Sequence, residues 1–319
     1  MKVWITGAGG MMGSHLAEML IDEGHEVQPT HYKPTIDALD LAGLASVEVD
    51  ITDWCSVLDS LSAFKPDAII HLAAQSYPVM SWQRPIETLR VNVIGTATVL
   101  EAARRTVPAA RIILAGSSAE YGILDAATGP VDEGHALRPL HPYGVSKVAT
   151  ELLAFQYFKS YGISALTVRI FNCTGPRKTG DAVSDFVRRC AWLERHPEEN
   201  SLRVGDLSTR RTIVDVRDLN RAMMLLLRRG QAGEAYNLGG AAAYQMREIL
   251  AVVKKECARD DLVEAVDEKL LRPTDERIIW GDCSKLSSAI GWTPQISLKQ
   301  TIADVFAYWR SKPDEALVI

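Results

Sequence analysis

The 319-residue sequence predicts an α/β fold in which a doubly wound parallel sheet is followed by a smaller, mixed C-terminal lobe. Short apolar runs alternate with stretches of helical spacing as far as residue 171, as in strands joined by crossover helices. One run, residues 68–74, is apolar almost throughout, which is typical of a strand covered on both faces. The alternation becomes irregular after residue 171, and this change predicts the second lobe.

A glycine-rich turn joins the first predicted strand, residues 3–5, to a helix over residues 14–23. Backbone N–H groups at such a helix start suit a pyrophosphate, so the turn predicts a Rossmann-type dinucleotide site. The glycines follow the pattern Gly-x-x-Gly-x-x-Gly instead of Gly-x-Gly-x-x-Gly. The residues predicted to line the cofactor here are Gly7, Gly10, Met11, Met12 and Gly13.

The second predicted strand, residues 26–30, is followed by His31, Tyr32 and Lys33. A carboxylate at this place would hold the 2′-hydroxyl of an NAD ribose, and none is present. We therefore expect NADP(H), with Lys33 beside the 2′-phosphate. A solvated Lys33 and NAD(H) as cofactor remain the alternative.

The next elements complete the cofactor side of the sheet. We predict a strand over residues 47–50, a helix over 54–64, the buried strand 68–74 and a helix over 85–105. Small side chains at the end of the buried strand leave room for a cofactor, whose predicted contacts there are Leu72, Ala73 and Ala74. His71, inside the same strand, is expected to be a structural histidine.

The fifth strand, residues 112–116, delivers Ser117 to the edge where open α/β sheets bind ligands. Tyr143 and Lys147 stand four residues apart at the start of a predicted helix over 143–161, so they share one helix face. An ammonium group favours a nearby phenolate, and we expect Lys147 to lower the pKa of Tyr143. Ser117, Tyr143 and Lys147 are therefore the predicted catalytic residues, suited to proton transfer.

The second half of the chain mixes helices and short strands after a sixth strand over 165–171. We predict a dinucleotide-binding domain at 1–171 and a mainly substrate-binding lobe at 172–319, with segments near 211–240 rejoining the sheet. The expected helices are 181–195, 217–229, 244–258 and 298–310, and the expected strands are 201–204, 211–216 and 235–239.

Several motifs resemble the extended short-chain dehydrogenase/reductases that act on nucleotide sugars, and among these the GDP-mannose branch. They are Gly7-x-x-Gly10-x-x-Gly13, Leu137-Arg138-Pro139-Leu140-His141-Pro142-Tyr143-Gly144-Val145-Ser146-Lys147, Arg169-Ile170-Phe171-Asn172 with Gly175-Pro176, Arg211 with Asp215-Val216-Arg217-Asp218, and Leu271-Arg272-Pro273-Thr274-Asp275 with Gly291-Trp292-Thr293-Pro294.

The resemblance implies further contacts and a homodimer built on the helices that hold residues 92–105 and 143–161. It places Asp50, Ile51 and Asn92 beside the cofactor, where Tyr143 and Lys147 also lie. The GDP-sugar substrate would contact Ser118 and Glu120, and its diphosphate would be held by Asn172, Arg177, Arg211 and Arg272.

One position separates two activities within this branch. The 4,6-dehydratases carry a glutamate two residues before the tyrosine that follows the fifth strand, and here that position is Ala119. An alanine transfers no proton, and Glu120 should point the other way if the segment is extended. The implied activity is NADP(H)-dependent reduction of the 4-keto group of a GDP-4-keto-6-deoxy sugar to GDP-D-rhamnose.

Other activities remain open at this point. Within the same class they are GDP-mannose 4,6-dehydratase, a nucleotide-sugar 4-epimerase and a GDP-heptose reductase. Outside enzymes, a sensor that binds NADP without chemistry would have little reason to retain Ser117, Tyr143 and Lys147 together.

Overall fold

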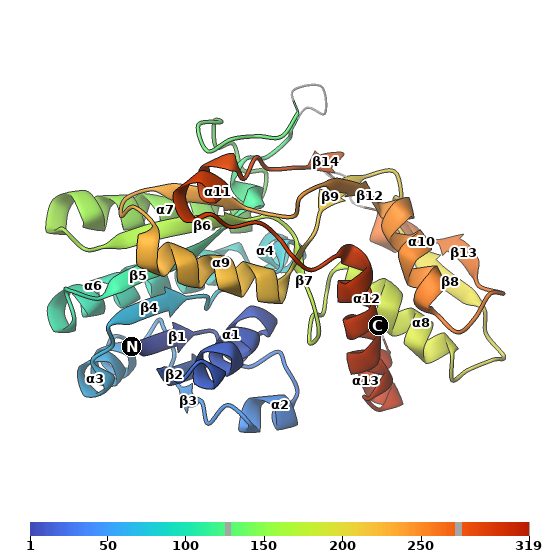
Figure 1. Cartoon of the computed structure of the whole chain (residues 1–319), viewed down its shortest axis with the longest axis horizontal. Helices are drawn as coiled ribbons and strands as arrows, with labels where there is room; N and C mark the ends of the chain where they lie inside the picture. The colour runs from blue at the N-terminus through green and yellow to red at the C-terminus, as the bar shows by residue number, and fades with distance from the viewer. Residues whose placement is uncertain (125–128, 272–275, 319) are drawn as a thin grey trace.

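The computed structural model describes residues 1–124, 129–271 and 276–318, and it confirms the predicted fold class (Figure 1). Within these residues seven parallel strands form the central sheet, in the order β11-β6-β5-β4-β1-β2-β3. Their carboxyl ends meet at one edge, and the strand order reverses between β1 and β4, where such sheets bind ligands. The strands are β1 (Lys2–Thr6), β2 (Glu26–His31), β3 (Val47–Glu48), β4 (Ala68–His71), β5 (Arg111–Ser117), β6 (Ala165–Ile170) and β11 (Ala235–Leu238).

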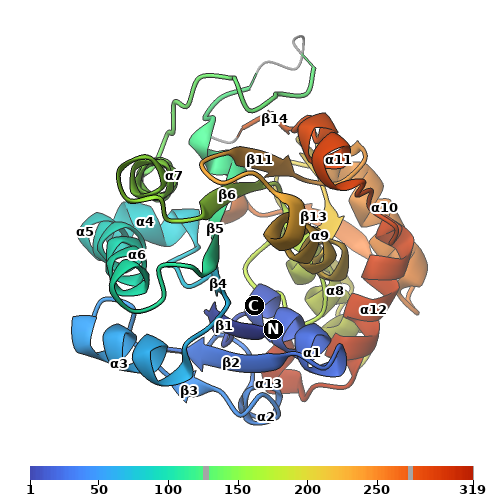
Figure 2. The same ribbon diagram turned by 60° about the vertical axis from the view of Figure 1, so that its left-hand side comes forward.

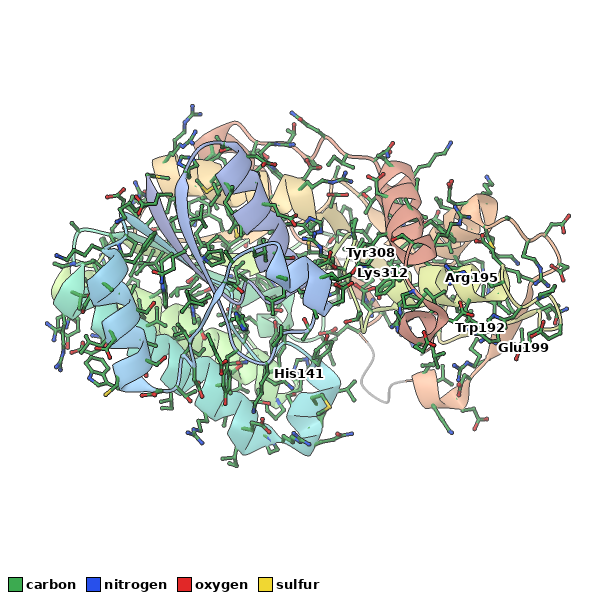
Figure 3. The ribbon with its side chains drawn as sticks, turned by 90° about the horizontal axis from the view of Figure 1, so that it is seen from below. His141, Trp192, Arg195, Glu199, Tyr308 and Lys312 are labelled. Carbon is green, nitrogen blue, oxygen red and sulfur yellow. The ribbon has the colours of Figure 1, made fainter. Side chains whose placement is uncertain are left out.

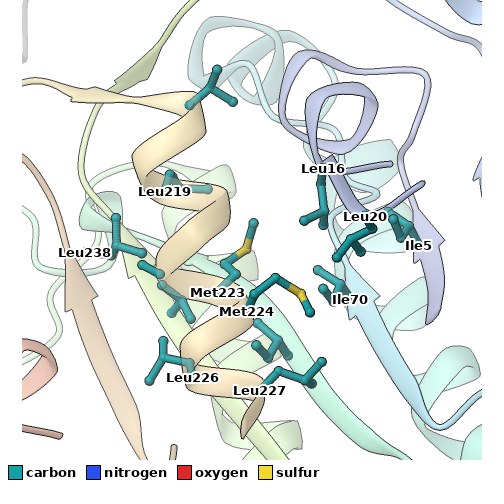
Figure 4. Packing of buried hydrophobic residues seen from close by; sticks show 14 of the residues in the cluster. Ile5, Leu16, Leu20, Ile70, Leu219, Met223, Met224, Leu226, Leu227 and Leu238 are labelled. Carbon is teal, nitrogen blue, oxygen red and sulfur yellow. The ribbon is translucent and has the colours of Figure 1, made fainter. Parts of the chain in front are cut away.

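Helices cover both faces of this sheet (Figure 2). On one face α1 (Met11–Asp22) and α9 (Val216–Arg229) pack on residues such as Ile70, as Figure 4 shows. On the other face α3 (Trp54–Phe64), α6 (Gly95–Thr106) and α7 (Pro142–Tyr161) pack on residues such as Ile69. Ile69 and Ile70 are both fully buried, because neighbouring strand residues point to opposite, covered faces. This explains the apolar run in the sequence.

The helix predicted over 85–105 is broken into three pieces, namely α5 (Pro85–Leu89), a π-helical turn over Arg90–Ile94 and then α6. A separate helix that was not predicted, α4 (Pro78–Gln83), precedes them. Proline begins both α4 and α5, where its missing N–H costs nothing. The periodicity of the sequence did not reveal the π turn, which contains Asn92.

The second half of the chain has a hydrophobic core of its own, which includes Phe186, Ile249 and Phe306. Its helices are α8 (Ala182–Leu193), α10 (Met246–Glu256) and α12 (Leu298–Arg310), and they pack beside the paired strands β8 (Ser201–Val204) and β13 (Val263–Val266). The boundary at residue 171 stays a prediction. Residues 235–238 do rejoin the main sheet, because β11 pairs with β6.

The strand predicted over 211–216 is two short strands, β9 (Arg210–Thr212) and β10 (Val214–Asp215). β9 lies between β12 (Ala243–Gln245) and β14 (Ile278–Ile279), and β10 pairs with β7 (Cys173–Thr174). Three further short helices were not predicted: α2 (Ala38–Ala42), α11 (Ser284–Ile290) and α13 (Asp314–Leu317). None of the helices described combines the length and apolar character that a bilayer requires.

Candidate active site

The structure brings Ser117, Tyr143 and Lys147 together at the carboxyl end of β5. Ser117 is the last residue of this strand, and its side chain is hydrogen-bonded to the Tyr143 phenol. Lys147 lies one helical turn beyond Tyr143, with its Nζ atom 5.8 Å from the centre of the Tyr143 ring. Its ammonium donates a hydrogen bond to the Ala115 carbonyl oxygen at 2.7 Å. All three side chains are buried, so their interactions are little weakened by water.

The first turn of α7 packs directly on the turn that follows β5. His141 caps the helix by accepting the Gly144 N–H at its Nδ1 atom, at 3.1 Å. A Cβ atom on Gly144 would lie only 2.5 Å from the Ala119 carbonyl oxygen. Only glycine therefore allows the two segments to approach this closely, and the approach places Tyr143 against Ser117.

Burial decides the ionisation of the tyrosine. It raises the pKa of Tyr143 to about 12, although the hydrogen bond with Ser117 acts in the opposite direction. Burial also lowers the pKa of Lys147 to about 8. The pKa of Tyr143 is therefore raised and not lowered as predicted, because desolvation of the phenol is the largest effect on it. At neutral pH Tyr143 holds its proton and can donate it.

Asn92 supports this arrangement from the π turn. Its Nδ2 atom donates to the Ser146 hydroxyl at 2.8 Å, and that hydroxyl donates to the Tyr143 carbonyl oxygen at 2.6 Å. The Asn92 Oδ1 atom accepts the Gln75 N–H at 2.8 Å. The amide therefore ties α7 to the segment after β4, and its predicted contact with the cofactor stays a prediction. Sequence reasoning missed Ser146 and Gln75, since only the fold brings them to Asn92.

The glycine turn lies against the end of β4. Gly7 has a φ of +74°, and a Cβ there would be 2.8 Å from the Ala73 backbone nitrogen. A Cβ on Gly13 would be 2.4 Å from the Gly7 carbonyl oxygen, whereas at Gly10 the nearest atom is the same oxygen at 3.4 Å. Gly7 in the turn thus lies directly against Leu72 and Ala73 at the strand end. The cofactor contacts of the turn (Gly7, Gly10, Met11, Met12, Gly13) and of the strand end (Leu72, Ala73, Ala74) stay predictions.

His71 is a structural histidine, as expected. Its ring nitrogens pair with the hydroxyls of Thr6 at 2.8 Å and Thr96 at 3.1 Å. Burial lowers the pKa of His71 to about 3, so the ring is neutral at physiological pH.

The residues predicted near the adenosine end occupy different environments. Lys33 is exposed, with a φ of 50° and its ammonium 5.1 Å from the centre of the Tyr32 ring. Ile51 is buried, and Asp50 uses its Oδ1 atom to accept two hydrogen bonds from Thr52. The cofactor contacts of Lys33, Asp50 and Ile51 stay predictions.

The diphosphate contact of Arg177 stays a prediction, and in this structure its guanidinium has protein partners. Its guanidinium forms two hydrogen bonds with Glu18, at 2.7 and 3.0 Å, and lies 3.5 Å from an Asp40 oxygen. This pairing joins Arg177 to α1 and α2. The sequence could not reveal it, because Glu18 is 159 residues away along the chain.

Tyr308 of α12 and Lys312, just after the end of that helix, join the same cluster, which we name the inter-lobe ion cluster. Tyr308 donates to an Asp40 oxygen at 2.8 Å, and Lys312 binds both Asp37 and Asp40. Figure 3 shows Tyr308 and Lys312 together where α12 meets the N-terminal segments. Asp37, the first carboxylate after β2, is also the cap of α2. The cluster thus consists of Glu18, Asp37, Asp40, Arg177, Tyr308 and Lys312.

Glu120 is also placed differently from the prediction. The segment after β5 is a 3₁₀ turn over Ser118–Glu120, so the argument from an extended strand does not apply. Glu120 nevertheless points inward and is fully buried, whereas Ser118 and Ala119 are partly exposed. A substrate contact by Glu120 does not fit this burial.

The remaining predicted substrate residues stay predictions. Asn172 has a buried Nδ2 atom without a hydrogen-bond partner among the described residues. Arg211 is half-buried on β9, and Ser118 lies partly exposed on the 3₁₀ turn. Arg272 lies outside the described residues. Within the described part of the chain, no three side chains of the metal-binding types gather to hold an ion.

Known proteins resemble this chain over nearly its full length. A family model described as GDP-mannose 4,6 dehydratase matches residues 4–305. A GDP-6-deoxy-D-mannose reductase from Pseudomonas aeruginosa is 30% identical over 315 residues, covering 98% of this chain and 99% of the relative. A GDP-mannose 4,6-dehydratase from Vibrio cholerae is 25% identical, covering 95% and 92%.

Two solved structures share the fold. The protein RMD from Pseudomonas aeruginosa, complexed with NADPH, has a TM-score of 0.86 and 28% identity, covering 97% of this chain and 99% of the other. A UDP-glucose 4-epimerase from Thermotoga maritima, solved with UDP-glucose, has a TM-score of 0.87 and 25% identity, with the same coverage.

The geometry of the glycine turn predicts different effects for two alanine substitutions. Gly13→Ala should lower the free energy of unfolding by about 1–3 kcal/mol, because the new methyl overlaps the Gly7 carbonyl oxygen. Gly10→Ala should leave it unchanged or raise it slightly, because its backbone conformation and surroundings accept a methyl. Urea denaturation of both variants measures the difference, and equal losses would contradict the packing.

Proposed function

This chain belongs to the GDP-mannose 4,6-dehydratase family and is a nucleotide-sugar enzyme of the short-chain dehydrogenase/reductase type; we propose that it reduces the 4-keto group of a GDP-4-keto-6-deoxy sugar with NADPH. The product would be GDP-D-rhamnose, also called GDP-6-deoxy-D-mannose. One observation carries the proposal: Ser117 and a protonated Tyr143 meet at the strand ends, with Ala119 where a dehydratase needs an acid.

The proposed mechanism uses groups that are already held in place. Bound NADPH would supply the hydride. Tyr143 donates its proton to the sugar oxygen as that oxygen gains negative charge, and Ser117 donates a hydrogen bond to the same oxygen. Lys147 stabilises the tyrosinate that remains, since its ammonium lies over the same ring.

Among the described residues, the site lacks a side chain that could transfer the protons needed to eliminate water from the sugar. Elimination requires a base for the C5 proton and an acid for the departing 6-hydroxyl. Ala119 can be neither, and the Glu120 carboxyl is turned into the protein with no exposed surface. These two positions favour reduction over dehydration.

The residues present fit a dinucleotide. Gly10 is the N-cap residue of helix α1. The space beside its Cα atom is open, since a Cβ built there would have no atom closer than 3.4 Å. Backbone N–H groups at this helix start would bind the pyrophosphate. Lys33 would bind the 2′-phosphate of NADPH, and Asp37 is engaged with Lys312 instead of being directed to a ribose. NAD(H) is the alternative cofactor.

We also propose a cytoplasmic location. All five cysteines are free thiols in the structure, as in proteins of reducing compartments. Fractionation of the source cells would locate the protein.

The proposed activity predicts a specific pair of results. Incubation with NADPH and GDP-4-keto-6-deoxy-D-mannose should oxidise NADPH and form GDP-D-rhamnose, followed by absorbance and by NMR of the product. GDP-mannose without added cofactor should remain unchanged. Release of water from GDP-mannose with a 4-keto product would establish the dehydratase instead. Epimerisation without net oxidation would establish the epimerase, and NADPH binding without turnover of any keto sugar would support the sensor.

The proton donor can be tested separately. Tyr143→Phe should lower kcat by a factor on the order of 10²–10⁴ while NADPH still binds, because only the hydroxyl is removed. Tyr161→Phe is the matched control, since Tyr161 lies at the exposed end of the same helix. Near-wild-type turnover by Tyr143→Phe would exclude this residue from the mechanism.

We propose that the chain forms a homodimer through α7 and its neighbours. Ile94, Leu152 and Phe155 are 56%, 59% and 47% exposed on the π turn and α7, although they are apolar. Light scattering should give twice the 35.1 kDa chain mass. Leu152→Glu should shift the mass toward one chain, whereas Leu39→Glu, at an exposed leucine of α2, should not. A wild-type monomer would contradict the proposal.

A further inference from the structure

Glu120 is a buried acid that the mechanism above does not use. Its two carboxyl oxygens have different environments. The Oε1 atom accepts the backbone N–H of Ser117 at 2.6 Å, in a capping box that closes the 3₁₀ turn. The Oε2 atom has no hydrogen-bond partner within the described structure, and the side chain is fully buried. A charged oxygen left in this state would be costly.

The nearest cation does not neutralise Glu120. The Arg169 Nε atom lies 3.8 Å from Oε2, which is beyond hydrogen-bond distance. Arg169 instead forms a bidentate pair with Glu151, at 2.6 and 2.8 Å, and its Nη1 atom donates to the Tyr121 hydroxyl and the Glu133 carbonyl oxygen. Glu151 therefore balances the charge of Arg169.

The other groups around Glu120 favour its protonated form. Burial and the charge of Glu151 raise the pKa of Glu120 to about 8, although the Ser117 N–H, Arg169 and Lys147 act in the opposite direction. The titratable or charged groups that face it are Lys147, Tyr143 and Glu151 from α7 and Arg169 from β6, and Arg169 in turn contacts Tyr121 and the Glu133 backbone. An anion at Glu120 would also raise the pKa of Tyr143 and weaken it as a proton donor.

The fold leaves a specific place for this carboxyl group. A Cβ on Gly116 would lie 2.7 Å from the Glu120 Oε1 atom and 2.9 Å from the Thr167 side chain. The glycine in β5 thus makes room for the acid, which sits directly behind Ser117.

We propose that Glu120 is a positioning residue that works as a neutral carboxylic acid: it holds the Ser117 N–H and so fixes the Ser117 hydroxyl against Tyr143. The positioning role rests on the proposed reductase function. The protonation state of Glu120 does not depend on that function, and unfolding experiments alone can test it.

The unfolding experiment compares two glutamates that face one arginine. Between pH 4.5 and 8 the folded chain keeps a proton on Glu120 that the unfolded chain has lost, so raising the pH through this range removes stability. Glu120→Gln imitates the neutral acid. The urea concentration at the unfolding midpoint should therefore fall for wild type between pH 5.5 and pH 8, by more than it falls for Glu120→Gln over the same range.

Glu151→Gln is the matched control, and it should lower the midpoint at pH 7 because it removes the ionised partner of Arg169. If Glu120→Gln is destabilised at pH 7 as much as Glu151→Gln, Glu120 is an ionised partner of Arg169 and the proposal is wrong.

The kinetic experiment tests the positioning role. Glu120→Gln retains an oxygen for the Ser117 N–H and should keep kcat within about threefold of wild type, whereas Glu120→Leu should lose about tenfold or more. The KM for NADPH should change little in both. Wild-type kcat in a folded Glu120→Leu would overturn the positioning role. If the wild-type protein shows no reductase activity, the proposed function is wrong. The unfolding curves would still show whether Glu120 is protonated in the folded chain.

Discussion

The close approach of α7 to the end of β5 is the contact on which the site depends. Gly144 lies so near the Ala119 carbonyl oxygen that no side chain fits between them. This contact sets Tyr143 against Ser117, and the hydrogen bonds of Asn92 and Ser146 hold the same helical turn from its other side. A phenol and a hydroxyl from segments 26 residues apart thus become one proton-transfer unit.

Burial determines the charge of this unit more strongly than neighbouring charges do. It keeps Tyr143 protonated, makes His71 neutral and lowers the pKa of Lys147 toward physiological pH. The same cause acts on Glu120 behind Ser117. A site in which Tyr143 holds a proton at neutral pH is suited to protonating a sugar oxygen as hydride arrives, and this is the direction of the proposed reduction.

The inter-lobe ion cluster gives the two halves of the chain a fixed relation. Arg177, Tyr308 and Lys312 come from the second half, and they meet Asp40 of the short helix α2. The same stretch after β2 is tied to the glycine turn, because the Gly9 carbonyl oxygen accepts the N–H of Thr35. The predicted substrate lobe and the glycine turn predicted to bind the cofactor are therefore connected through this stretch.

The sequence by itself determined the fold class, the glycine turn and the meeting of Ser117, Tyr143 and Lys147 at one strand end. Hydrophobic period, glycine spacing and the i, i+4 relation are local properties that can be read along the chain. Only the tertiary structure decided that Arg177 pairs with Glu18 and Asp40, that Glu120 turns inward, that Asn92 lies in a π turn and that Tyr143 keeps its proton. These features depend on burial and on partners distant in sequence, because desolvation and charge pairing are set by which segments the fold brings together.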